Sequence, residues 1–234
     1  MKKIAIILAT EKEYESVKNI MDEIEEKNIR NEIFLEGKIE KIPCVIAKCG
    51  VGKVNAARMT QMLIDNFKLE SIINLGAAGA LDPMLNVGDI VIGEELVQHD
   101  FDITAFGHTK GYITDIGDRI YSNHNLVEDF KKIIKNTEDR IYKIETGTIA
   151  SGDIFCTESH MKNKIYAKFD AKCVEMEGAA IAQVCYLEEI PFVIIRSISD
   201  TANSDNNAME YEQFEELASR RCANILKEYM KKLA

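Results

Sequence analysis

Three carboxylates stand directly after predicted strands, where they could serve in acid–base chemistry. Glu13 follows the first apolar run of the chain, Glu177 follows the short run Cys173–Met176, and Asp200 ends the run that starts at Pro191. Because α/β sheets bind their ligands at the carboxyl ends of the strands, we expect the three side chains to converge. Any one of them alone is better explained by helix capping or a solvated first turn, but three together favour a site.

Convergent carboxylates are suited to cleaving a glycosidic bond. This reaction needs an acid on the leaving group, a base for the attacking water, and room between them for the sugar. At a helix N-terminus, Glu177 is expected to stay ionised and to accept hydrogen bonds from sugar hydroxyls. Asp200 would have to hold a proton near neutral pH, which requires burial or a neighbouring negative charge.

The strand predicted over Pro191–Asp200 positions the last of these acids. Its apolar, largely β-branched residues follow a proline, a pattern typical of a short strand that is buried on both faces. Its polar members Arg196, Ser199 and Asp200 stand toward its carboxyl end, where we expect a ligand to bind.

The rest of the chain alternates between patterns typical of strands and of helices. Strands are expected at about 4–9, 31–39, 43–49, 71–75, 88–97, 142–150 and 173–176. Helices are expected at about 11–26, 54–67, 125–135, 158–166, 178–187 and 211–232, and a long loop at 99–121. This alternation predicts a single α/β domain over residues 1–234, a three-layer α/β/α sandwich with a central mixed β-sheet.

Two glycine pairs follow predicted strands without matching a nucleotide-binding motif. The run Gly50–Lys53 lacks the spacing and the Ser or Thr of a phosphate loop, and it lacks the third glycine of a dinucleotide fingerprint. The run Gly76–Gly79 has two interpretations. Its small residues let a ligand approach the backbone closely, or they let the chain turn.

Composition and charge exclude several classes of function. The 234 residues carry a net charge of −10, which argues against electrostatic binding of nucleic acid or of an anionic membrane. No run approaches the ~18 apolar residues of a membrane span. The six cysteines form no Cys-x-x-Cys pair and the four histidines show no ligand spacing. We therefore expect reduced thiols, a cytoplasmic location and no metal site.

Seven motifs occur in order along the chain: Ala9–Glu13, Cys49–Ala57, Ile73–Gly79, Val87–Val91, Ser151–Asp153, Val174–Glu177 and Arg196–Asp200. Together they resemble the bacterial 5′-methylthioadenosine/S-adenosylhomocysteine nucleosidases, of the wider purine nucleoside phosphorylase and nucleosidase family. The resemblance implies a nucleoside phosphorylase-like fold. It also implies hydrolysis of the N-glycosidic bond of 5′-methylthioadenosine, S-adenosylhomocysteine and 5′-deoxyadenosine. It further implies a small-molecule adenosine derivative as ligand, no cofactor, and a homodimer.

The resemblance assigns roles to the matching polar residues. Glu13 corresponds to the base that activates the attacking water, and Asp200 to the acid that protonates adenine N7. Ser199 corresponds to a hydrogen-bond partner of that acid. Glu177 corresponds to the residue that holds the ribose 2′ and 3′ hydroxyls, and Arg196 to an arginine near the water and the acidic cluster.

The remaining matching positions surround the substrate. Met176 is expected to pack against the ribose, Phe155 to stack on adenine, and the Cys156 backbone to bond the adenine edge. A neighbouring subunit is expected to supply part of the pocket for the 5′-alkylthio group, whose residues are Val51, Ile103, Phe106 and Tyr211.

Four pocket positions depart from the commonest family pattern: Thr10, Ala77, Cys156 and Tyr211 stand where methionine, serine, an aliphatic residue and phenylalanine are frequent. None of these positions is one of the three carboxylates. The resemblance therefore still implies the same reaction type, but it does not predict which 5′-substituent is preferred.

Two other functions are compatible with the same fold. A phosphate-dependent purine nucleoside phosphorylase would need cations around the phosphate, and these are sparse near Asn74 and Ala77, where Glu13 would repel phosphate. A non-catalytic adenosyl-metabolite binding protein should have lost a carboxylate, and all three are present.

Overall fold

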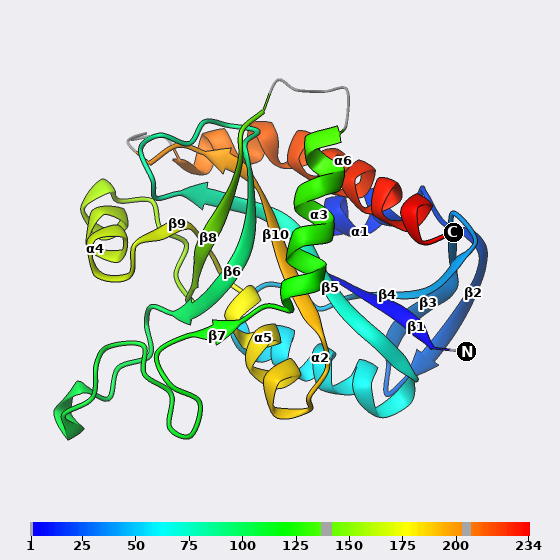
Figure 1. The fold of residues 1–234 in the computed structure, drawn as a ribbon, viewed down its shortest axis with the longest axis horizontal. Helices are drawn as coiled ribbons and strands as arrows, with labels where there is room; N and C mark the ends of the chain where they lie inside the picture. The colour runs from blue at the N-terminus through cyan, green and yellow to red at the C-terminus, as the bar shows by residue number, and fades with distance from the viewer. Residues whose placement is uncertain (1, 137–141, 203–206) are drawn as a thin grey trace.

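The computed structural model describes residues 2–136, 142–202 and 207–234, which form a mixed sheet flanked by helices (Figure 1). In the described residues the sheet has ten strands: β1 (Lys3–Leu8), β2 (Asp22–Ile29), β3 (Glu32–Ile39), β4 (Ile42–Lys48), β5 (Leu69–Ala80), β6 (Ile90–Gln98), β7 (Ile120–Tyr121), β8 (Ile144–Ser151), β9 (Ala171–Glu175) and β10 (Phe192–Asp200). The described helices are α1 (Glu11–Lys18), α2 (Lys53–Asn66), α3 (His124–Asn136), α4 (Ser159–Phe169), α5 (Gly178–Leu187), α6 (Asn207–Leu233) and the short 3-10 helix η1 (Thr104–Phe106).

The sheet closes on itself at one end and stays open at the other. Its order is β10-β6-β8-β9-β5-β1-β4-β3-β2, β7 pairs with β6, and β10 also pairs with β5. Five strands therefore form a closed ring, from which β1, β4, β3 and β2 extend. Within the ring β10 runs parallel to β5, with Arg196 opposite Gly76 and Asp200 opposite Gly79. Gly79 also pairs with Val174, so the carboxyl ends of β5, β9 and β10 meet.

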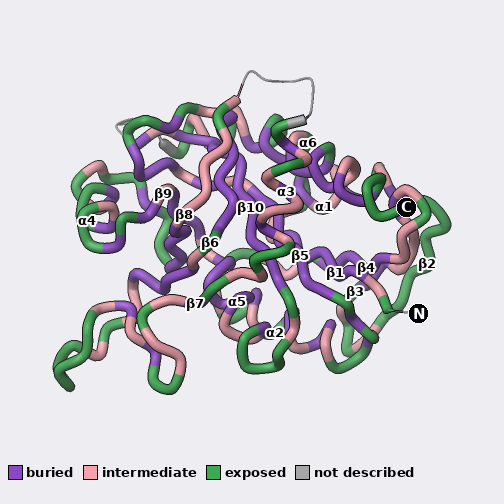
Figure 2. The backbone as a smooth tube through the Cα atoms, in the orientation of Figure 1, coloured by how far each residue is buried: buried purple, intermediate pink, exposed green. Residues whose placement is uncertain are grey.

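Helices cover both faces of the sheet and bury two large apolar cores. On one face α2 and α5 contribute Met59, Leu63 and Ile181 to the first core. On the other face α1, α3 and α6 pack over the second core, which includes Phe130 and Leu226. The predicted α/β class with a central mixed β-sheet between helical layers is confirmed. The central strands are buried along most of their length, whereas the segment around η1 is largely exposed (Figure 2).

The first helix is shorter than predicted, because its expected second half forms a strand. α1 ends at Lys18, and β2 pairs with β3 across a turn at Arg30 and Asn31, which both have positive φ. Val17 of α1 packs in the second core, but Ile24 lies on the edge strand and is 41% exposed. The β3–β4 hairpin offers backbone hydrogen bonds to this segment, and the charged residues of β2 suit an exposed sheet edge.

Strand β5 is longer than the predicted strand at 71–75. It spans 12 residues because Gly76–Gly79 continue in pairing with β10, and Gly79 and Ala80 also pair with Val174 and Cys173 of β9. The loop predicted at 99–121 is interrupted only by η1 and β7. The loop predicted before the last helix falls partly on residues 203–206, outside the described residues. None of the described helices is long and apolar enough to cross a membrane.

Candidate active site

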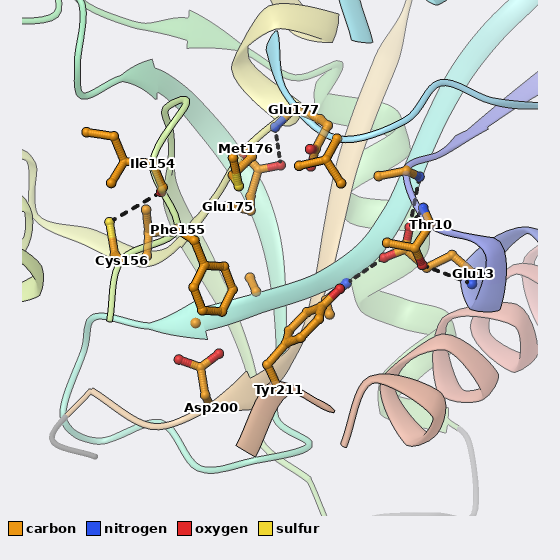
Figure 3. A pocket seen from close by; sticks show the side chains of 16 residues that line it. Thr10, Glu13, Ile154, Phe155, Cys156, Glu175, Met176, Glu177, Asp200 and Tyr211 are labelled. Atoms are coloured by element: carbon orange, nitrogen blue, oxygen red, sulfur yellow. Dashed lines mark hydrogen bonds between the residues drawn. The ribbon is translucent and has the colours of Figure 1, made fainter. Parts of the chain in front are cut away.

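A cavity of about 340 Å³ opens where the carboxyl ends of β1, β5, β9 and β10 meet (Figure 3). Its lining comes from these strand ends, from the loops after β4 and β8, and from α6: Ala9, Thr10, Glu13, Val51, Ala77, Ala78, Gly79, Ile154, Phe155, Cys156, Val174, Glu175, Met176, Glu177, Asp200 and Tyr211. The structure thus brings together ten of the fourteen side chains predicted for the site. The volume suits a small organic ligand.

Glu13 reaches the cavity from the first turn of α1, and backbone groups hold its carboxylate. Glu13 and Thr10 form a capping box, in which Glu13 Oε2 accepts from the Thr10 N–H at 3.1 Å. Oε2 also accepts from the Ala9 N–H at 2.8 Å, and Oε1 accepts from the Ala77 N–H at 3.1 Å. Burial raises the pKa of Glu13, while the Arg196 guanidinium and the three N–H groups oppose that rise. A carboxylate in this setting is suited to accept a proton.

Glu177 stands at the N-cap of α5, but its carboxylate lines the cavity instead of capping the helix (Figure 3). Its Oε1 accepts from the Gly52 N–H at 2.8 Å. Glu175 caps the helix in its place, because Glu175 Oε2 accepts from the N–H groups of Glu177 at 3.1 Å and Gly178 at 2.7 Å.

The protonation of Glu177 differs from the prediction. Burial, and then the charge of Glu175, raise the pKa of Glu177 to about 8, against the opposing effect of the Gly52 N–H. The prediction that the helix N-terminus keeps this group ionised is therefore wrong, because burial outweighs the helix dipole.

Arg196 lies behind the cavity and supports it from there. It is 1% exposed, forms a buried ion pair with Glu175, and donates from Nη2 to Asn74 Oδ1 at 2.6 Å. Ser151 also donates to Glu175. Glu175 was not among the predicted site residues. Its place as the last residue of β9, two positions before Glu177, is the signal that could have found it.

Asp200 faces the cavity from the end of β10, and two side chains bind it. Ser199 Oγ donates to Oδ1 at 2.9 Å, and Lys162 Nζ donates to Oδ2 at 2.7 Å. The sequence led us to expect burial or a negative neighbour. Asp200 is buried, but its charged neighbour is a cation. Lys162 was not predicted, although its spacing from Ile165 and Phe169 places it on the buried face of α4.

Two glycines of β5 lie directly against the two carboxylates. A Cβ atom at Gly76 would lie 2.5 Å from Glu13 Oε1, and one at Gly79 would lie 2.8 Å from Asp200 Oδ2. Neither glycine has a positive φ, so close approach, and not a turn, requires them. The group that approaches the backbone is in both cases a side chain of the protein itself.

Aromatic side chains border the space between the two carboxylates. In Figure 3 Tyr211 lies between Asp200 and Glu13, and Phe155 lies beside Asp200; the two ring centroids are 5.5 Å apart in an edge-to-face arrangement. Phe155 is 44% exposed, which leaves ring surface available to a planar ligand. The Tyr211 hydroxyl donates to Glu215 Oε1 at 3.1 Å, so the polar atom that distinguishes Tyr211 from phenylalanine has a partner.

Four predicted residues do not line the cavity. Arg196 and Ser199 lie behind the carboxylates that they bind. Ile103 and Phe106 belong to the segment that carries η1 and projects away from the sheet, and Phe106 is 81% exposed (Figure 1). The structure does not bring these last two side chains to the cavity of their own chain.

The ionisable side chains that line the cavity are acidic. Among its described lining residues none is Lys, Arg or His, and four are carboxylates: Glu13, Glu175, Glu177 and Asp200. The two cations just behind the lining, Arg196 and Lys162, are each paired with one of these acids. Across the part of the chain that the structure describes, no three His, Cys, Asp or Glu side chains are grouped so as to hold a metal ion.

Known proteins resemble this chain over nearly its whole length. The family model described as "Phosphorylase superfamily" matches residues 3–231. A 5′-methylthioadenosine/S-adenosylhomocysteine nucleosidase of Geobacillus kaustophilus is 40% identical over 225 residues, which cover 96% of this chain and 94% of the relative.

Two solved structures share the fold. The Neisseria meningitidis nucleosidase of the same name, in complex with methylthio-immucillin-A, has a TM-score of 0.94 and 37% identity, over 99% of this chain and all of the other. The futalosine hydrolase of Helicobacter pylori has a TM-score of 0.92 and 30% identity, over 99% of this chain and 98% of the other.

Proposed function

Because the chain belongs to the family of 5′-methylthioadenosine/S-adenosylhomocysteine nucleosidases, within the phosphorylase superfamily, we propose that its cavity hydrolyses the N-glycosidic bond of these two adenosine derivatives. The products are adenine and a 5′-substituted ribose. One observation carries the proposal: the buried carboxylates Glu13 and Asp200 reach the same small cavity from different strand ends. Such a pair supplies the base and the acid that the cleavage of a glycosidic bond needs.

In the proposed reaction Glu13 removes a proton from water while the water oxygen bonds to C1′ of the ribose. The electron pair of the broken C1′–N9 bond moves onto adenine, whose N7 takes a proton from Asp200. Glu177 binds the 2′ and 3′ hydroxyls, and in its protonated form it can donate one hydrogen bond and accept another. The negative charge of the cavity favours the oxocarbenium-like sugar of the transition state.

The cavity also contains groups suited to the base and the sugar. The exposed ring surface of Phe155 supports stacking on adenine, and the Cys156 backbone supports bonding of the adenine edge. Met176 supplies an apolar contact for the ribose beside Glu177. These roles rest on the position of each residue in the cavity lining.

The charges of the cavity favour hydrolysis over phosphorolysis. A phosphate nucleophile would meet four acidic side chains, and both nearby cations are already paired with two of them. Glu13 lies where the nucleophile must be activated, and it would repel an anion while it binds a water molecule. A family member that only bound its ligand would have no use for a buried acid and a buried base in one cavity.

We further propose that the chain acts as a homodimer whose partner covers the 5′ end of the cavity. Val51 lines the cavity yet is 50% exposed, and Phe106 projects into solvent. A second copy would bury both apolar side chains. Light scattering should give twice the chain mass, and Phe106→Asp should shift it toward the monomer. A wild-type monomer would end this part of the proposal.

We place the reaction in the cytoplasm. All six cysteines are unpaired in the structure, which suits a reducing compartment. Cell fractionation with an antibody to the chain should find it with cytoplasmic markers, and recovery in a secreted fraction would contradict this location.

The test of the reaction is release of adenine from 5′-methylthioadenosine in phosphate-free buffer, repeated with added phosphate. We expect the same rate in both buffers and a free 5-methylthioribose product. A rate that requires phosphate would identify a phosphorylase instead. S-adenosylhomocysteine, 5′-deoxyadenosine and futalosine as further substrates would rank the 5′-substituents, which the shared fold does not determine.

A further inference from the structure

Lys162 is a buried lysine that the proposed reaction has not yet used. It is 1% exposed, and its ammonium lies 2.7 Å from Asp200 Oδ2 and 3.0 Å from the Thr201 carbonyl oxygen. Ile165 and Phe169, on the same face of α4, pack in the apolar cluster beside β8 and β9. The helix therefore holds the lysine stem among apolar groups while its charged end reaches the carboxylate.

The surroundings of Asp200 leave its side chain little freedom. Ser199 Oγ binds Oδ1, Lys162 Nζ binds Oδ2, and the backbone at Gly79 approaches so closely that a Cβ atom there would lie 2.8 Å from Oδ2. Each oxygen of the carboxyl group thus has its own side-chain partner. A group held in this way keeps one orientation toward the cavity.

A structural role alone accounts poorly for a lysine at this position. Burial strips an ammonium group of its hydration, which costs several kcal/mol. Buried ion pairs can often be replaced by apolar residues without loss of stability. A methionine would fill the same apolar path between Ile165 and the end of β10. The ammonium is therefore best explained by what it does for Asp200.

We propose that Lys162 is a positioning residue for the leaving-group step: it holds Asp200 toward the purine and pairs with the carboxylate that remains after proton transfer. The inference rests on the proposed function. In this step Asp200, after taking a proton from solvent, gives that proton to adenine N7, the C1′–N9 electron pair moves to the base, and Lys162 keeps its own protons. A charge-assisted hydrogen bond to the carboxylate product makes the transfer more favourable.

The experiment compares two substrates that differ in their need for an acid. One is 5′-methylthioadenosine, and the other is a 5-methylthioriboside whose 4-nitrophenolate leaving group departs without protonation. We expect Lys162→Met to lower kcat for the adenosine substrate by about 10- to 10²-fold, part of the usual contribution of general acid catalysis. Its KM should change little, and hydrolysis of the nitrophenyl riboside should stay near the wild-type rate.

Three further variants make the test specific. Lys162→Arg retains the charge and should recover part of the lost kcat. Lys164→Met, on the exposed face of the same helix, is the matched control and should behave like wild type. The double variant Lys162→Met with Asp200→Asn leaves neither charge unpaired, and it should be no slower on 5′-methylthioadenosine than Asp200→Asn alone, because Lys162 acts only through Asp200.

Several results would overturn the proposal. A wild-type kcat of Lys162→Met on 5′-methylthioadenosine would contradict the proposal. An equal loss of kcat on both substrates, in folded Lys162→Met or in the double variant, would also contradict it, because Lys162 would then act through the shape of the pocket. If Lys162→Met does not fold, the double variant decides through its rate on the nitrophenyl riboside, which must stay near wild type. Failure of the proposed function is a separate result, because wild-type protein would then release no adenine from 5′-methylthioadenosine.

Discussion

The two ends of the cavity hold their carboxylates by different means. At one end three backbone N–H groups bind the two oxygens of Glu13. At the other end both partners of Asp200 are side chains, the Ser199 hydroxyl and the Lys162 ammonium. Both carboxylates are buried, and both lie against a glycine of β5. The two ends therefore differ mainly in the kind of hydrogen-bond donor that holds the carboxylate.

The backbone fold therefore fixes the position of the Glu13 carboxylate, whereas two side chains fix the position of the Asp200 carboxylate. Backbone donors remain when a side chain is substituted, and they carry only partial charge. Side-chain donors can be lost in a single substitution, and one of these carries a full positive charge. We expect the Asp200 end to respond to changes in its neighbours, and the Glu13 end to respond mainly to changes in its own side chain or backbone.

The largest effects are expected from the carboxylates themselves. Glu13→Gln and Asp200→Asn should each lower kcat for 5′-methylthioadenosine by at least ~10²-fold, the usual scale for a general base or acid. Glu188→Gln, at an exposed position, is the control. With a leaving group that needs no proton, Asp200→Asn should recover and Glu13→Gln should not. Turnover at the wild-type rate by either variant would remove that residue from the mechanism.

Substituting the two glycines of β5, Gly76 and Gly79, should have the next largest effects on kcat, and the two effects should differ in size. Gly76→Ala places a Cβ 2.5 Å from a carboxylate that is held on three sides by backbone, so Glu13 must lose bonds. Displacement of about 1 Å can cost ~10²-fold in rate. Gly79→Ala should cost less, about 10-fold, because its Cβ would lie 2.8 Å from Asp200 Oδ2, a less severe contact than the one at Gly76. Steady-state kcat with a parallel melting curve measures both, and a larger loss in Gly79→Ala would reverse the comparison.

Substituting one neighbour at each end should give smaller effects on kcat, and these should differ between the ends. Ser199→Ala removes a buried donor to Asp200, so it should lower kcat several-fold and cost about 1–3 kcal/mol of stability. Thr10→Ala keeps all three N–H donors to Glu13 but removes the N-cap of α1, so it should cost about 1 kcal/mol of stability while kcat stays within about 2-fold. Urea unfolding and steady-state kinetics separate the two effects. A Thr10 variant with the larger kcat loss would contradict the comparison.

The last effect concerns the pH dependence of stability and Glu177, which lines the same cavity. Its pKa in the folded protein is about 8, above the ordinary value of 4.5, so the native state binds more protons between these values. The free energy of unfolding should therefore fall as the pH rises through this window, in the same direction as the contribution of Glu13.

Glu177→Gln removes this contribution and should flatten the curve. Each kcal/mol lost corresponds to roughly 2–4 °C in Tm for a chain of this size, so melting curves at pH 6 and pH 9 have the resolution to compare the two proteins. Equal pH dependence of the wild-type protein and the variant would mean that burial does not raise the pKa of Glu177.

Much of the fold could be predicted because its signals are local. Strand and helix periods are repeated within a few residues, and they located β10 and α5 nearly to the residue. β2 was missed because its strand pairing depends on a hairpin that follows it, and a short charged segment carries little strand signal of its own. The closed ring could not be predicted, since it depends on β10 pairing with both β5 and β6.

The features of the candidate site also divide into those that the sequence could predict and those that it could not. Glu13, Glu177 and Asp200 were found because each stands at the end of a strand or a few residues after it, a position that can be located along the chain. The Lys162 partner of Asp200 was missed, because the two residues are 38 positions apart and nothing in either segment indicates the other. The raised pKa of Glu177 was missed too, because it depends on burial and on a second carboxylate of β9.

By itself the sequence determined the α/β class, the strand ends that carry the three acids, and the family to which the chain belongs. The tertiary structure alone decided which donors bind each acid, which of them is charged, and how far each acid is removed from water. The physical reason is that periodicity and motifs are properties of neighbouring residues. Burial and electrostatic pairing are properties of segments that meet only when the sheet closes.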